Sequence, residues 1–294
     1  MRVSTPYQFE TFSNSIRTAQ EAYFRVQRQI STGKKFESAS EDPLSTRLSI
    51  NTRTLKSRFE QFDKNLRGAN DYLGFSENAL ADVTDVVNQA NQLAIQGASS
   101  AIDVGAAQSL ADQVGKLQER LVRLANTQGG QGQYIFAGQK NGTAPYSASG
   151  GVLTYSGDGN PIRAEIRSGE YMDINLAGID TDFVDMYAKL EQLKTNLSNQ
   201  DVVAISTQSL ADIKGIRDKV TNLRAEVGSR LQTVQSLKDE NTRRIDDFTK
   251  DISDYEDVDL SDAIVRYQQT QSAYQAAMQV ASQGMNLSLM DFLR

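Results

Sequence analysis

The 294-residue chain contains no Cys, no His and no Trp, and only four Pro. Without Cys it cannot form disulfides or thiolate metal sites. Without His it lacks the commonest metal ligand and the usual general base near neutral pH. These absences remove most metallohydrolase and catalytic-triad mechanisms, although an enzyme based on Asp, Glu, Lys, Ser or Tyr is not excluded. We expect no cofactor and no metal site.

Long hydrophobic runs are also missing. No apolar stretch approaches the roughly 18–20 residues that span a bilayer, so we expect no membrane partner. The N-terminal stretch MRVSTPYQFETFSNSIRTAQ lacks the apolar core of a cleavable secretory signal. The sequence predicts either an intracellular protein or one exported by a route that needs no such signal.

Charge is unevenly distributed along the chain, whose net charge is -6. Residues 1–70 hold twelve Lys and Arg against seven Asp and Glu, whereas residues 239–262 hold three against ten. Both segments can simply be solvated helix faces, or the basic and acidic segments can lie side by side, within or between subunits. We expect no nucleic acid binding, because acids dilute the basic residues and no aromatic platform accompanies them.

Apolar side chains recur at spacings of four and three residues over much of the chain, which is the heptad period of packed helices. A helix of about 50 residues would be roughly 75 Å long, too long for a compact globule. We therefore predict a mainly α fold, an elongated antiparallel helical rod resembling a coiled-coil bundle. Its predicted core in the front half is Leu55, Phe59, Phe62, Leu66, Leu73, Leu80, Val83 and Val87.

The composition changes in the middle of the chain, where residues 129–182 are rich in Gly. Short apolar runs at 133–137, 151–156, 162–166 and 171–175 predict strands, and the turn residues of 141–142 and 157–160 predict hairpins. The rod therefore carries a small β insert. The predicted organisation is a terminal helix and loop (1–47), the front half of the rod (48–128), the β insert (129–182), the rear half (183–256) and a C-terminal helix (257–294).

Both terminal helices carry an apolar stripe but lie beyond a helix breaker. Isolated helices of their size are marginal in water, so they either pair with each other or wait for neighbouring subunits. The pattern leaves both arrangements open, and the residues of the two stripes are Phe12, Ile16, Tyr23, Val26, Ile30, Leu260, Ile264, Tyr267, Tyr274, Met278, Met285 and Phe292.

The loop ISTGKKFESASEDPLST, residues 30–46, separates the first helix from the rod. Gly33 can end a helix, because glycine takes the left-handed conformation without steric cost. Asp42 can cap the next helix, and Pro43 suits its first position, where the missing N–H costs nothing. These three residues are predicted to set the junction between the two helices.

Three stretches carry a resemblance to a known family. The start MRVST, the loop STGKKFESASEDP and the C-terminal DLSDAIVRYQQTQSAYQAAMQVASQGMNLSLMDFL resemble the flagellin superfamily. The start, the YIFAG element and the LSLMDFL ending are most similar to its members at the junction between hook and filament. The likeness covers nearly the whole chain.

This resemblance implies a structural subunit of the bacterial flagellum that joins hook to filament and is not an enzyme. It implies export through the flagellar type III channel, and a chaperone at the C-terminal region. It also implies self-association in a ring-like layer through the terminal helices, so that the residues of their apolar stripes are assembly contacts. Another hook-associated protein and flagellin are the implied neighbours. Two alternatives stay open: a short flagellin that forms the filament, and an enzyme or glycan-binding module on the β insert.

Overall fold

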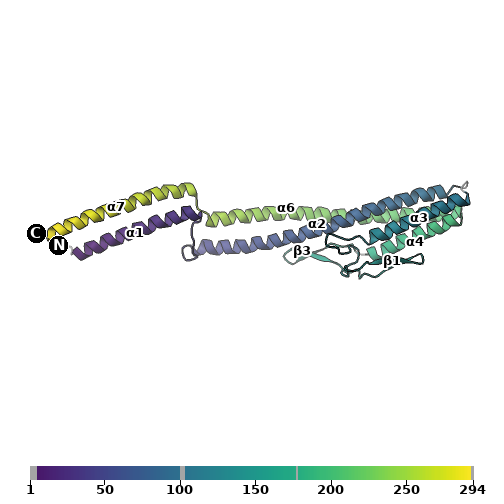
Figure 1. Ribbon diagram of the computed structural model, residues 1–294, viewed down its shortest axis with the longest axis horizontal. Coiled ribbons are helices and arrows are strands. Elements are labelled where there is room, and N and C mark those ends of the chain that lie inside the picture. The colour runs from purple at the N-terminus through teal and green to yellow at the C-terminus, as the bar shows by residue number, and fades with distance from the viewer. Residues whose placement is uncertain (1–4, 100–102, 177, 293–294) are drawn as a thin grey trace. The chain divides into compact units, whose positions relative to one another are not determined.

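The computed structural model describes the backbone of residues 5–99, 103–176 and 178–292, with side chains except at residues 5, 6, 8 and 284–292. In chain order its elements (Figure 1) are α1 (Thr5–Thr32), α2 (Pro43–Gly97), α3 (Val104–Ala125), β1 (Tyr146–Ser149), β2 (Val152–Tyr155), β3 (Arg163–Arg167), β4 (Glu170–Asp173), α4 (Ile179–Ser198), α5 (Val202–Ala204), the π-helical η1 (Ile205–Ser209), α6 (Leu210–Glu256) and α7 (Leu260–Phe292). The prediction of a mainly helical fold with long antiparallel helices and a small β insert is confirmed.

The chain divides into two compact units. We call Phe59–Arg243 the central unit, and Met1–Arg58 together with Arg244–Arg294 the terminal unit. Helices α2 and α6 contribute residues to both.

The central unit is a helical bundle in which α3 and α4 pack against parts of α2 and α6 (Figure 1). Helices α2 and α6 run antiparallel, and Arg224 of α6 donates from Nε and Nη2 to Oε1 of Glu77 on α2, at 2.9 and 2.6 Å. One continuous apolar core extends from Leu66 to Leu237. Of the predicted rod core, Phe62, Leu66, Leu73, Leu80, Val83 and Val87 are buried there, and Phe59 is half-buried.

Leu55 departs from this pattern, and its assignment to the rod core is wrong. It lies in the terminal-unit part of α2 with 42% of its surface exposed. Ser49 and Thr52 are buried there, with only 2% and 9% of their surface exposed. The packed face of α2 is therefore centred there on small polar residues. A heptad register chosen from apolar residues alone points to the neighbouring face.

The β insert consists of two separate antiparallel hairpins, β1–β2 and β3–β4. Tyr146 pairs with Tyr155 in the first hairpin, and Arg163 pairs with Asp173 in the second. Gly150 and Gly151 connect β1 to β2 with φ of 60° and 80°, the conformation that the tightest hairpin turns require. Strands predicted at 151–156, 162–166 and 171–175 overlap β2, β3 and β4.

The strand predicted at 133–137 is absent, and β1 was missed. Ile135, Phe136 and Ala137 are all buried, whereas a strand with one solvent face buries alternate residues. Within residues 133–137 the backbone forms a single isolated bridge, between Tyr134 and Gln128, and no strand. The turn predicted at 157–160 links β2 to β3 and does not close a hairpin.

Aromatic packing anchors the insert to the helices of the central unit. The Phe183 ring of α4 lies 5.2 Å from the Phe136 ring and 5.4 Å from the Tyr146 ring, centre to centre. The Tyr146 hydroxyl donates to the carbonyl oxygen of Ile179 at 3.0 Å. The insert thereby shares the core of the central unit.

Candidate functional site: the terminal helix pair and its linkers

Helices α1 and α7 pack against each other along their length and run antiparallel (Figure 1). Tyrosines form the centre of the contact. The hydroxyl groups of Tyr23 and Tyr267 are 2.9 Å apart, and the Tyr23 ring stacks on Tyr274 at a centroid distance of 5.9 Å. Val26, Ala263 and Ala281 are buried beside them. The small alanines let the helices approach closely, so the pair is held by a narrow seam.

The predicted assembly residues divide between this seam and the surface. On α1, Val26 is buried and four others are half-buried: Phe12, Ile16, Tyr23 and Ile30. On α7, Tyr267 and Tyr274 are half-buried at the seam. Leu260, Ile264 and Met278 are exposed by 52%, 50% and 42%. The side chains of Met285 and Phe292 lie outside the described residues. Helix α7 therefore keeps part of its predicted stripe uncovered.

The loop after α1 has the local chemistry that its sequence predicts. Gly33 follows the last residue of α1 with φ of 71°. Asp42 accepts a hydrogen bond from the Ser45 backbone N–H at 3.0 Å, and Pro43 is the first residue of α2. That hydrogen bond lowers the pKa of Asp42, because it stabilises the ionised carboxylate. Helix α1 therefore ends at a glycine, and α2 begins with an aspartate cap.

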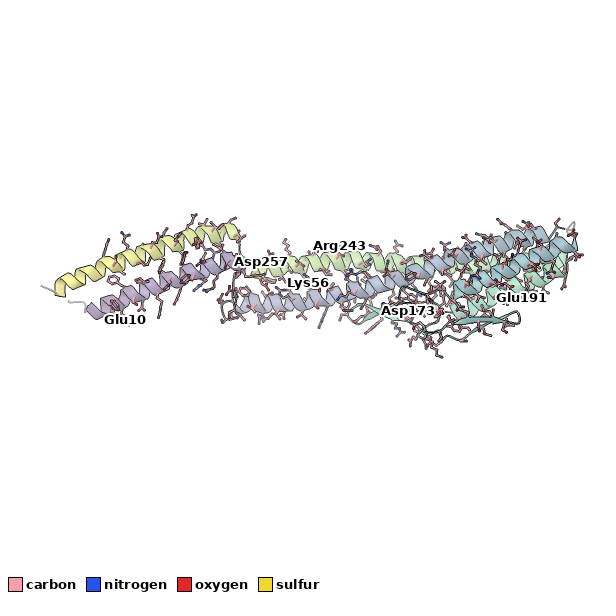
Figure 2. All side chains as sticks on the ribbon, viewed as in Figure 1. Glu10, Lys56, Asp173, Glu191, Arg243 and Asp257 are labelled. Atoms are coloured by element: carbon pink, nitrogen blue, oxygen red, sulfur yellow. The ribbon has the colours of Figure 1, made fainter. Side chains whose placement is uncertain are left out.

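The sequence did not predict how this loop is held. It pairs with the linker between α6 and α7 through two backbone hydrogen bonds, which make one antiparallel bridge. Lys35 N–H donates to the Glu256 carbonyl at 2.6 Å, Val258 N–H donates to the Gly33 carbonyl at 2.9 Å, and Lys34 forms a β-bridge with Asp257. The position of Asp257 between α6 and α7 is marked in Figure 2. Two linkers more than 200 residues apart therefore form one joint.

Side chains reinforce the joint. Lys34 Nζ lies 2.6 Å from Asp257 Oδ1 and 3.1 Å from Glu256 Oε2, and Arg53 Nη2 lies 2.7 Å from Glu256 Oε2. The Ser49 hydroxyl also donates to Glu256. We call this group the linker clasp: residues 33–35 and 256–258 with Ser49 and Arg53.

The electrostatics of the clasp favour its ionised form. Hydrogen bonds from Arg53, and then from Ser49 and Lys34, lower the pKa of Glu256 to about 2 although partial burial opposes them. The Lys34 ammonium lowers the pKa of Asp257. The pKa of Lys34 rises, chiefly through its hydrogen bond to Asp257. The uneven charge of the sequence was the only signal of this pairing, and it did not indicate which residues pair.

The described residues offer no comparable site for chemistry. They contain no group of three or more His, Cys, Asp or Glu side chains placed to hold a metal ion. An open groove of about 630 Å³ lies between α1 and the loop and mixes Phe24 and Phe36 with charges of both signs. None of the described helices is long and apolar enough to cross a bilayer. The terminal pair and its clasp are therefore the candidate functional site.

Comparison with known proteins finds similarity to flagellar proteins. The bacterial flagellin N-terminal helical region matches residues 3–141. Flagellar hook-associated protein 3 of Escherichia coli (strain K12) is 26% identical over 314 residues, covering 98% of both chains. The protein of that name from Salmonella typhimurium is 25% identical and also covers 98% of both. The N-terminal part of the chain is therefore similar to bacterial flagellin, and nearly the whole chain is similar to flagellar hook-associated protein 3.

Solved structures of flagellar proteins show a similar fold. FlgL of Bacillus cereus has a TM-score of 0.61 at 24% identity, covering 69% of this chain and 99% of that one. The flagellar junction protein FlgL of Legionella pneumophila has a TM-score of 0.60 at 13% identity, covering 71% and 100%. Both are structures of flagellar proteins, and their likeness to this chain shows a shared fold.

Proposed function

We propose that the protein is a subunit of the junction between the hook and the filament of the bacterial flagellum. The relatives named flagellar hook-associated protein 3 match it from end to end. Within the junction, copies associate side by side in a ring-like layer, with another hook-associated protein on one side and flagellin on the other. The protein is exported to the flagellum, and an export chaperone binds its C-terminal region.

The observation that supports assembly through the terminal helices is the incomplete burial of α7. Leu260, Ile264 and Val265 lie in the first two turns of α7, and each exposes at least half of its surface. Burying a large apolar side chain stabilises by about 1.5–3 kcal/mol, so a neighbour that covers these residues gains substantially. A short flagellin would use the same helices, but it would polymerise alone into long filaments.

The test replaces Leu260 and Ile264 with Asp in the full-length protein. Because both side chains are exposed, we expect the melting temperature of the purified protein to change little, while incorporation into flagella is lost. Val152→Asp, which alters an equally exposed residue of β2, is the matched control and should still incorporate. Immunoblots of the culture medium separate failed assembly from failed export. Normal incorporation of the Asp variant would refute assembly through α7.

A further inference from the structure

The terminal-unit part of α2 leaves an apolar face without a partner. Leu44, Leu48 and Leu55 are 58%, 37% and 42% exposed. They are spaced by four and seven residues, so they lie on one side of the helix. The face that meets α6 instead presents Ser49 and Thr52, which are buried. The helix therefore packs through small polar residues, and the three leucines stay partly exposed on the side next to that packed face, where a self-sufficient amphipathic helix would bury its leucines.

Two arginines border this apolar face. Arg47 and Arg58 are separated by eleven residues, or about three turns, and both are exposed on the side of α2 away from α6. Neither takes part in an ion pair within the described part of the chain. We call Leu44, Leu48, Leu55, Arg47 and Arg58 the basic stripe.

The same unit carries an acidic counterpart on α6. Asp247, Asp251 and Asp254 follow one another at spacings of four and three residues and are exposed. Ile252, on the opposite side of α6, is buried. The three carboxylates have no ion-pair partner among the described residues. We call them the acidic stripe.

The geometry of one chain keeps the two stripes apart. Helices α2 and α6 meet through Ser49, Arg53 and Glu256, and both stripes lie away from that contact. They therefore cannot neutralise each other within a subunit. Two copies placed side by side can bring the basic stripe of one against the acidic stripe of the next. Such a contact joins two different surfaces, and contacts of this kind close into rings when the rotation allows.

We infer that the basic stripe on α2 docks on the acidic stripe on α6 of a second copy. This inference rests on the proposed function and names the lateral contact of the layer. A second copy is favoured over an unrelated partner because a single chain supplies both complementary surfaces. Complementary charge gives specificity and speeds encounter, and the leucines supply apolar area to bury.

The test exchanges the charges. Variant A carries Arg47→Asp and Arg58→Asp, variant B carries Asp247→Lys, Asp251→Lys and Asp254→Lys, and variant AB carries all five changes. Variants A and B should each incorporate into flagella at least about tenfold less than the wild type. Variant AB should recover to within about threefold, because its stripes are again complementary. The matched control, Lys116→Asp with Lys140→Asp, reverses two exposed cations of the central unit and should incorporate normally.

The outcomes separate this inference from the proposed function. Variant A incorporating like the control, or AB incorporating no better than A and B, would overturn the lateral contact while leaving the junction role intact. Wild-type protein that never enters flagella would overturn both. Thermal melting of each purified variant checks folding. If the aspartates of variant A destabilise α2, a variant with Arg47→Gln and Arg58→Gln replaces it. This neutral variant should still incorporate less than the wild type.

Discussion

In the central unit, side chains from α2, α3, α4 and α6 and from the β insert enclose one apolar core. Leu66, Leu73, Leu80 and Phe183 are completely buried in it. In the terminal unit, the buried residues among those described are Val26, Ser49, Thr52, Ile252, Ala263 and Ala281. Four of these six are alanine, serine or threonine, and none is aromatic. The same heptad spacing therefore yields a closed core in one unit and a narrow seam in the other.

The terminal unit replaces apolar burial with polar fastening. Tyr23 bonds to Tyr267 across the seam, and the clasp joins Lys34 and Arg53 to Glu256. Such contacts fix geometry but add little net stability, since a typical hydrogen bond contributes about 0.5–1.5 kcal/mol. The central unit therefore has an extensive apolar core of its own, whereas the terminal unit relies more on polar contacts, which fits the proposed assembly through α7.

Two aspartate substitutions on α2 give the largest expected contrast between the units. Leu80→Asp places a carboxylate in a fully buried site, and we expect at least about 4 kcal/mol of destabilisation, enough to unfold the central unit. Leu55→Asp, at a site 42% exposed, should cost less than about 1 kcal/mol. Urea unfolding followed by circular dichroism measures both, and equal costs would show that the units do not differ in burial.

Removal of the Glu256 carboxylate tests the fastening of the terminal unit. Glu256→Ala leaves Lys34 and Arg53 without this acceptor, and we expect the clasp to lose about 2 kcal/mol. The amide protons of Lys35 and Val258, which bond across the joint, should then exchange about 30-fold faster with solvent. Amides of the central unit should not change, and neither should any amide in the control Glu119→Ala, which alters an exposed residue of α3. Unchanged exchange at Lys35 would mean that backbone pairing alone holds the joint.

Much of this contrast was beyond the sequence. The heptad pattern predicted the helices, and Gly33, Asp42 and Pro43 predicted the junction, because caps and glycine ends depend on local chemistry. The exposure of Leu55 depends on how α2 is rotated toward α6, which a residue pattern does not encode. The clasp joins residues 34 and 256, and a sequence-wide charge imbalance cannot specify such a pair. Strand β1 was missed because YSAS has little apolar character, while the buried run at 135–137 imitated a strand.

Acid should loosen the terminal unit before it affects the central core. The pKa of Glu256 is about 2 in the folded protein against 4.5 for a free glutamate, and that of Asp257 is also lowered. The clasp therefore contributes its full stabilisation above pH 4.5 and loses it as the pH falls toward 2. Lys34 and Arg53 have raised pKa values, so they stay charged throughout this range. Carbon-13 shifts of the Glu256 carboxyl follow the titration, and a midpoint near 4.5 would contradict the clasp electrostatics.

The smallest effect that we expect concerns the tyrosine seam. Tyr23→Phe removes one hydroxyl of the pair with Tyr267 but keeps the ring that stacks on Tyr274. Because the Tyr267 hydroxyl is only half-buried and can turn to water, the loss should be about 0.5–1 kcal/mol. Tyr23→Ala also removes the ring and should cost more, since stacking and apolar burial are lost together. Exchange rates of the α1 amides measure both variants. If Tyr23→Phe raises the exchange rates as much as Tyr23→Ala does, the hydroxyl pair and not the ring holds the seam. The contact between α1 and α7 would then be polar, like the contact between the linkers.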